Sequence, residues 1–217
     1  MYTLYYSPGA CSLATQVILH ELDQAVEIKN VQQVEHFKTI NPVGAVPVLL
    51  DDDLFNTNEA KADKALTEGA AIILYLLQKH ENTLLPATGY EYQQGVENIM
   101  FANATMHPAY SRLFFIAQAI SDENIHDKKV KQAAFNAAAE SISNLWQVVE
   151  QKLSMQVDGG LFLGGTKPSA ADILLSVYSR WGASFPVDMT LGPKTQAMIT
   201  AVLALPSFKK ALAAEQD

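Results

Sequence analysis

The sequence predicts an α+β protein, with a small sheet and its helices in the N-terminal third and an all-helical region after it. Up to about residue 82, short β-branched and aromatic runs alternate with amphipathic helical stripes. From residue 91 onward, apolar residues recur at helical spacing only, and proline and glycine interrupt the chain between the two regions. We therefore expect a sheet-containing domain over 1–82, a linker over 83–90 and an all-α domain over 91–217.

Composition narrows the functional classes. The chain has 217 residues, 49% of them hydrophobic and 18% charged, which is typical of a globular protein with a core. Its net charge of −8 argues against binding to nucleic acid or to an anionic membrane surface. We see no signal peptide and no apolar run long enough for a membrane span, and one cysteine permits no internal disulfide. We expect a cytoplasmic protein.

The first elements follow from short-range patterns. Residues 3–6 are β-branched or aromatic and predict a strand, after which Pro8 and Gly9 predict a turn. Ser12 can cap a helix that runs to about residue 22. Residues 26–31 alternate apolar and polar side chains, so they predict a second strand, parallel to the first.

The remainder of this domain predicts a β-β-α arrangement. The apolar run at 46–50 indicates a strand, and Pro47 near its start belongs at an entry point, an edge or a cis turn. Residues 67–76 indicate a strand end that passes into a helix, with Glu68 in the first helical turn. A β-α-β unit followed by β-β-α indicates a thioredoxin-like domain.

Two residues of this domain are candidates for chemistry. Cys11 falls at or just before a helix N-terminus, where unpaired N–H groups and the helix dipole favour a thiolate. The alternative is a small buried side chain with no reactivity. Glu68 either complements the helix dipole or holds a ligand's ammonium group beside the N–H groups that bind its carboxylate.

Three motifs carry a resemblance to a known family: Ser-Pro-Gly-Ala-Cys-Ser-Leu at 7–13, Asn-Pro-Val-Gly-Ala-Val-Pro-Val-Leu at 41–49 and Leu-Thr-Glu-Gly-Ala-Ala-Ile at 66–72. Their order and spacing resemble the glutathione transferase superfamily, and the bacterial beta class most closely. The resemblance covers the whole chain. It implies a thioredoxin-like domain followed by an all-helical one, glutathione as co-substrate, no metal, and a homodimer.

The resemblance also implies roles for single residues. Cys11 matches the beta-class active-site cysteine, with Ala10 beside it in the glutathione site. The backbone of Val46 matches the group that pairs with the cysteinyl unit of glutathione, and Pro47 matches the family's cis-proline. Glu68 matches the acid that binds the γ-glutamyl ammonium. One further position departs from the pattern, because Gly69 stands where many relatives have serine and leaves only its N–H for the γ-glutamyl carboxylate.

Two stretches of the first domain depart from the beta-class pattern. The link between residues 31 and 41 is short and lacks an obvious basic contact for the glycine end of glutathione, although His36 or Lys38 could substitute. The polar segment 51–65 is longer than a hairpin needs, and it is either a surface loop or a lid or subunit contact.

In the second domain, Asn103 and His107 lie one turn apart on an apolar helical stripe together with Met100, Tyr110 and Phe114. A lone histidine on such a face is usually a core residue, but the family's cleft borders this helix, so the resemblance implies a catalytic His107. Pro108 predicts a bend at this point. The residues that the resemblance implies for the substrate pocket are Tyr6, Asn103, Tyr110 and Trp181. Tyr6 is expected to serve packing first and catalysis second.

The other helical signals are typical of structural elements. Residues 127–153 predict a long helix, Ser169 and Asp172 form a capping box, and residues 205–208 begin a last short helix. The five histidines are dispersed and Cys11 has no companion, so no metal-ligand spacing is present.

These observations predict a glutathione transferase that conjugates glutathione to small electrophiles, exchanges thiols and disulfides through Cys11, or performs peroxide-linked chemistry. The alternatives are a non-catalytic ligand-binding or stress-associated dimer on the same scaffold, and a glutathione-dependent isomerase. The sequence does not identify the electrophile.

Overall fold

The computed structural model of the chain describes residues 1–54, 65–156 and 159–216, and these residues form two compact units. The first unit comprises residues 1–85 and 203–217, and the second comprises residues 86–202. The sequence assigned residues 91–217 to one helical domain, whereas the last fifteen of them pack with the sheet-containing unit.

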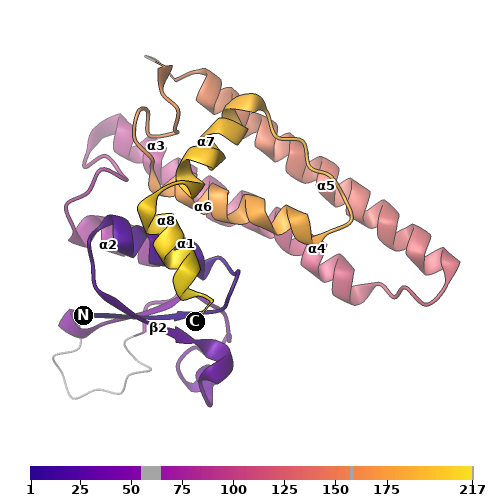
Figure 1. Cartoon of the computed structure of the whole chain (residues 1–217), viewed down its shortest axis with the longest axis horizontal. Coiled ribbons are helices and arrows are strands. Elements are labelled where there is room, and N and C mark those ends of the chain that lie inside the picture. Colours follow the sequence, from indigo (N-terminus) through magenta and orange to yellow (C-terminus); the bar gives the residue numbers. More distant parts are fainter. Residues whose placement is uncertain (55–64, 157–158, 217) are drawn as a thin grey trace. The chain divides into compact units, whose positions relative to one another are not determined.

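The first unit contains a three-stranded sheet of order β2-β1-β3 with helices on one face (Figure 1). Strand β1 pairs with β2 in parallel and with β3 in antiparallel orientation. In chain order its elements are β1 (Tyr2–Tyr6), α1 (Ser12–Glu21), β2 (Val26–Asn30), the 3₁₀ turns Val31–Gln33 and Phe37–Thr39, β3 (Val48–Asp51), the 3₁₀ turn Asp52–Leu54, α2 (Gly69–Lys79) and α8 (Pro206–Ala214).

Three of the four strands in the predicted β-α-β and β-β-α units form, with small shifts at their ends. Strand β3 starts at Val48 and not at residue 46, because Pro47 has no N–H to give to a ladder. A single antiparallel bridge between Leu49 and Leu66 stands where the strand before α2 was expected. Residues 55–64 of the long polar segment lie outside the described residues, so the two hypotheses for that segment stay untested.

Successive side chains of β1 point to opposite faces of the sheet, and both faces are covered. Leu4 joins the core beneath α1 and α2 with Leu13, Ile18, Leu49, Ile72 and Leu76, all fully buried. On the opposite face Tyr5 packs on Phe37, with ring centroids 5.7 Å apart, and on Val48 and Leu50. Phe37 thus anchors the short link between β2 and β3, while its neighbours His36 and Lys38 remain exposed.

Helix α8 completes the first unit by packing along α1 (Figure 1). The Ser207 hydroxyl bonds to the Glu21 carboxylate, which joins the start of α8 to the end of α1. The last short helix was predicted, but its partner was not, because an amphipathic pattern does not say which apolar surface it will cover.

The described residues of the second unit form helices joined by loops and turns. It contains α3 (Gly89–Met100), a π-helical turn (Phe101–Met106), α4 (His107–Ala119), α5 (Ile125–Ser154), α6 (Ala170–Ser179), a 3₁₀ turn (Arg180–Ser184) and α7 (Pro193–Leu203). Trp146 on α5 is fully buried and donates its indole N–H to the Tyr110 hydroxyl at 2.9 Å. The Ser169–Asp172 capping box forms as predicted and starts α6, whose residues are almost all buried.

No single described helix is both long and apolar enough to cross a membrane, although consecutive helices α7 and α8 meet that test when taken together. The described ranges also hold no group of three His, Cys, Asp or Glu side chains that could bind a metal ion.

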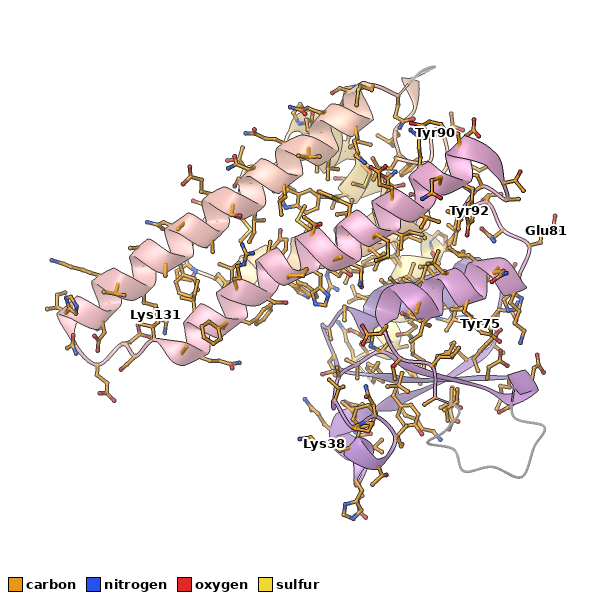
Figure 2. All side chains as sticks on the ribbon, turned by 180° about the vertical axis from the view of Figure 1, so that it is seen from behind. Lys38, Tyr75, Glu81, Tyr90, Tyr92 and Lys131 are labelled. Atoms are coloured by element: carbon orange, nitrogen blue, oxygen red, sulfur yellow. The ribbon has the colours of Figure 1, made fainter. Side chains whose placement is uncertain are left out.

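A charged network fastens α2 to the end of β3. Asp51 is 1% exposed, and its Oδ2 accepts hydrogen bonds from Lys79 Nζ at 2.6 Å and from the Tyr75 hydroxyl, which projects from α2 (Figure 2). Burial alone raises the pKa of Asp51, but hydrogen bonds from Lys79, Tyr75 and the Asp53 N–H outweigh it and hold that pKa below its ordinary value. The network therefore contains a buried carboxylate that depends on Lys79.

We predict that Lys79→Met lowers the free energy of unfolding by about 3–5 kcal/mol at pH 7, because it leaves the Asp51 carboxylate buried without its cation. In the wild type, the stabilisation from Asp51 is lost as pH falls from about 4, the unfolded-state pKa, through the lower folded-state pKa. Urea denaturation should therefore show the difference between the two proteins shrinking on acidification, since protonation relieves the unpaired charge in the variant.

The matched control is Lys29→Met. The pair between Lys29 and Glu27 is half-exposed, so its loss should cost less than about 1 kcal/mol. Equal effects of the two substitutions at pH 7 would contradict the stabilising role of the Asp51 network.

Candidate functional site

The turn between β1 and α1 presents the only cysteine of the chain. The Ala10 N–H donates to the Ser7 carbonyl at 3.1 Å, and Gly9 takes a φ of +74°, which glycine adopts without a steric cost. The Ser12 hydroxyl bonds to both the N–H and the carbonyl of Ser7. Ser12 is thus the first residue of α1 and ties the turn, while Cys11 occupies the N-cap position that was predicted for Ser12.

The Cys11 thiol reaches across to the segment that precedes β3. Its Sγ lies 3.4 Å from the Val46 carbonyl oxygen, to which the thiol donates a hydrogen bond. Cys11 is half-buried and not enclosed in the core. The thiol thus bonds to a backbone group of the second motif, 35 positions along the chain.

Burial raises the pKa of the Cys11 thiol to about 11, against the smaller lowering effect of the Cys11 and Ser12 backbone N–H groups. The expectation of a thiolate at this helix N-terminus was therefore wrong for the protein without ligand. The helix end does act in the expected direction, but the loss of hydration around the sulfur is larger. Cys11 is a neutral hydrogen-bond donor at neutral pH.

A compact loop delivers Val46 to this position. The peptide bond between Val46 and Pro47 is cis. Asn41, which is 4% exposed, donates from its side chain to the Ala45 carbonyl at 2.8 Å and accepts from the Val43 N–H at 3.2 Å. Asn41 is a supporting residue that was not identified from the sequence, although an Asn-Pro pair before a glycine does indicate such a side-chain turn.

Glu68 lies at the N-terminus of α2 in an unusual backbone conformation. It is the N-cap residue, with φ +66°, and not a member of the first turn as predicted. A positive φ at a residue other than glycine costs about 1–3 kcal/mol of conformational energy, and such strained residues are common at binding sites. The exposed side chain makes no capping hydrogen bond with the helix N-terminus, where Gly69 is the first helical residue.

The sheet brings Glu68 beside the cis-proline segment. Leu49 and Leu66 exchange both backbone hydrogen bonds at 2.9 Å in antiparallel register. In this antiparallel arrangement Pro47 and Glu68 each lie two residues from the bridge, on the same side of it. The first unit therefore gathers the turn with Ala10 and Cys11, the carbonyl of Val46, and the α2 N-terminus with Glu68 and Gly69.

The remaining predicted residue of this unit, Tyr6, ends β1 and is 6% exposed. It lines a cavity beside β2 whose lining does not include Cys11, Val46 or Glu68.

The second unit holds His107 within an aromatic cluster. The His107 ring stacks on Tyr178 and lies against Trp181, with centroid distances of 5.1 Å to each. Tyr110 packs edge-on against the same Trp181. Burial lowers the pKa of His107, so the imidazole is neutral at pH 7.

The helical stripe that the sequence predicted around His107 is only partly correct. Tyr110 is buried, but Asn103 is half-buried, and Met100 and Phe114 are 42% and 40% exposed. The π-helical turn just before His107 accounts for Met100, because it rotates the residues ahead of it relative to His107 and Tyr110. Pro108 accounts for that turn, since it has no N–H for the Ala104 carbonyl and its ring would clash there.

Comparison with known proteins places this geometry in a family. Residues 4–84 match the family model for the N-terminal domain of glutathione S-transferase. Glutathione S-transferase GST-4.5 of Xanthomonas campestris is 29% identical over 98% of this chain and 98% of its own. The beta-class glutathione S-transferase of Sphingomonas chungbukensis is 29% identical, with a TM-score of 0.77 over 98% of both chains. These likenesses support the glutathione transferase superfamily for this chain.

Within the superfamily the chain lies near the bacterial beta class. A sphingomonad glutathione S-transferase solved in complex with glutathione is also 29% identical, with a TM-score of 0.77 over 99% of this chain and 98% of that one. The thioredoxin-like first domain and the helical remainder expected from the sequence are therefore confirmed. The roles of single residues in this transferase fold stay predictions.

We predict that alkylation of Cys11 by iodoacetamide accelerates about tenfold per pH unit between pH 7 and 10, because only the thiolate reacts and the thiol pKa is about 11. Cys11 is the only cysteine, so the mass of the intact protein reports this reaction alone. A rate that levels off near pH 7 would show a stabilised thiolate and contradict a neutral Cys11 at that pH.

Proposed function

We propose that the protein is a glutathione transferase that joins the sulfur of glutathione to small electrophiles. The observation that carries the proposal is the convergence at one edge of the sheet of Cys11, the Val46 carbonyl and the α2 N-terminus. These groups can bind a peptide that carries a free carboxylate, a free ammonium group and a thiol.

Each end of glutathione has a partner in this proposal. The N–H groups at the start of α2, including that of Gly69, would bind the γ-glutamyl carboxylate. The Glu68 carboxylate makes no capping hydrogen bond with α2 and would hold the ammonium group. The backbone of Val46 would pair with the cysteinyl unit, beside Ala10 and Cys11.

The neutral Cys11 thiol suits a donor role in conjugation. The cysteinyl N–H of glutathione would donate to the Val46 carbonyl and replace the Cys11 thiol there. The Cys11 thiol could then donate its hydrogen bond to the glutathione sulfur. A donor at that position stabilises the glutathione thiolate. The thiolate attacks the electrophilic carbon, the carbon–sulfur bond forms, and the leaving group departs with its electron pair while the thiol proton of glutathione goes to solvent.

The neutral state of the Cys11 thiol disfavours thiol–disulfide exchange as the main activity. Disulfide exchange through Cys11 requires its thiolate, and with a pKa of about 11 only roughly one molecule in several thousand carries it at pH 7.5. Conjugation needs the thiolate of glutathione and only the thiol of Cys11. This difference is why we place conjugation ahead of thiol exchange and peroxide chemistry.

The second unit would take the electrophile. His107, Tyr110 and Trp181 belong to one aromatic cluster, with Asn103 at the preceding π-helical turn. Neutral rings favour an apolar or aromatic compound, and His107 would act as a hydrogen-bonding group and not as a cation. As in the family, we expect the working form to be a homodimer.

We predict that Cys11→Ser retains most conjugation of a generic aromatic halide, whereas Cys11→Ala loses about 10–100-fold in kcat, because serine keeps a donor and alanine does not. Turnover is followed by the absorbance of the conjugate, and retention on glutathione resin shows that each variant still binds. Similar losses in both variants would indicate a nucleophilic Cys11. Wild-type protein that binds the resin without turnover would favour the non-catalytic alternative.

A further inference from the structure

The turn that carries Cys11 is held by the far end of the chain. The Gly9 N–H donates to Glu215 Oε2 at 3.0 Å, although the two residues are 206 positions apart. Gly9 is two residues before Cys11, and Glu215 is the C-cap residue of α8. A carboxylate therefore fixes a backbone amide of the turn with a charge-assisted hydrogen bond.

Helix α8 is tied to α1 at both ends. Ser207 at its start bonds to Glu21 at the end of α1, and Glu215 after its last turn bonds to Gly9 ahead of α1. The two helices thus run antiparallel, with one tether remote from Cys11 and one next to it. These tethers offer a matched pair for experiment, because both dock α8 but only one touches the Cys11 turn.

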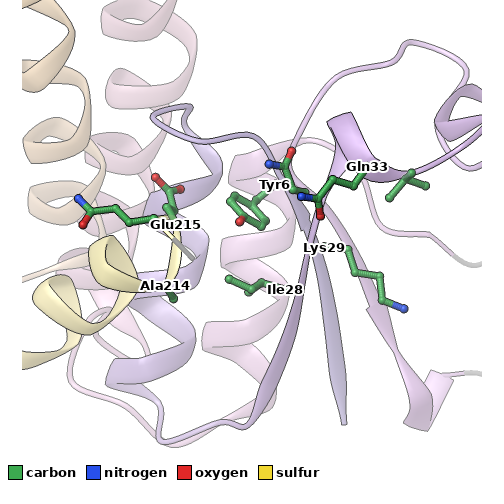
Figure 3. A pocket seen from close by; sticks show the side chains of 9 residues that line it. Tyr6, Ile28, Lys29, Gln33, Ala214 and Glu215 are labelled. Carbon is green, nitrogen blue, oxygen red and sulfur yellow. The ribbon is translucent and has the colours of Figure 1, made fainter.

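The Glu215 tether borders open space. Glu215 lines a cavity of about 730 Å³ together with Tyr6, Gln33 and other residues of β2 and the C-terminal segment. Figure 3 shows the Glu215 carboxylate at the end of α8 beside the ring of Tyr6, which ends β1 just before the turn. The hydrogen bond from Gly9 therefore ends on a side chain that lines this cavity.

We propose that Glu215 is a positioning residue of the active site: it holds the Gly9 backbone so that the Cys11 thiol points at the Val46 carbonyl. Loss of this tether leaves the Ser7–Ser12 and Ser7–Ala10 bonds in place but removes one restraint on Gly9, whose φ has a wide range. The thiol then spends more time in water and becomes easier to ionise. The inference rests on the proposed role of Cys11, but it concerns the geometry of the thiol and not the glutathione reaction.

The test is the rate of Cys11 alkylation by iodoacetamide from pH 7 to 10, without glutathione. Glu215→Ala should raise the rate at pH 8 by about 3–10-fold, because a more hydrated thiol has a pKa closer to its ordinary value. Glu215→Gln should restore a rate within about twofold of wild type, since its amide oxygen can accept from the Gly9 N–H. In the proposed reaction, Glu215→Ala should also raise KM for glutathione more than it lowers kcat.

Ser207→Ala is the control, because it loosens α8 at the tether remote from Cys11. It should lower Tm by an amount similar to Glu215→Ala while leaving the alkylation profile unchanged. Wild-type alkylation in Glu215→Ala, with a Tm shift like that of Ser207→Ala, would overturn the proposal and leave Glu215 a structural residue. Because alkylation requires no glutathione, this outcome is distinct from a failure of the proposed function, which would appear as absent turnover in the wild type.

Discussion

The site depends on one hydrogen bond, from the Cys11 thiol to the Val46 carbonyl, because it joins two segments that the sheet only brings near each other. The thiol comes from the start of α1 and the carbonyl from the cis-proline segment ahead of β3. A neutral thiol satisfies that carbonyl and is itself kept from ionising by the burial that the contact requires. One contact thereby sets both the position and the protonation state of the sulfur.

The rest of the first unit can be understood as support for that contact. Ser12 fixes the turn from inside α1, and Asn41 fixes the loop that ends at Val46. The Leu49–Leu66 bridge brings the α2 N-terminus alongside, and the buried Asp51–Lys79 network fastens the other end of α2 to β3. Glu215 adds a restraint from the C-terminal segment. Each of these groups is polar and acts over a short distance, whereas the apolar core mainly fixes the sheet and its helices.

The sequence was sufficient for the fold because local patterns specify it. β-branched, alternating and apolar runs predicted the strands, helical spacing predicted α1 and α2, and three motifs in order indicated the family. What could not be predicted depends on tertiary surroundings. The pKa of Cys11 follows from how much protein covers the sulfur, and the π-helical turn ahead of Pro108 changes which side chains near His107 are buried. The positive φ of Glu68 and the docking of α8 on α1 likewise leave no periodic signal.

The most direct test of a shared site is a glutathione titration followed by ¹⁵N-resolved NMR of the backbone amides. Binding at the proposed site should shift the amides of Val46 and Gly69 with one common dissociation constant, because both N–H groups meet the same ligand. The indole N–H of Trp146, buried on Tyr110, should not move. Two outcomes would contradict a single glutathione site at this edge of the sheet. In one, the saturable shifts leave the Val46 and Gly69 amides unchanged; in the other, the two amides follow different dissociation constants.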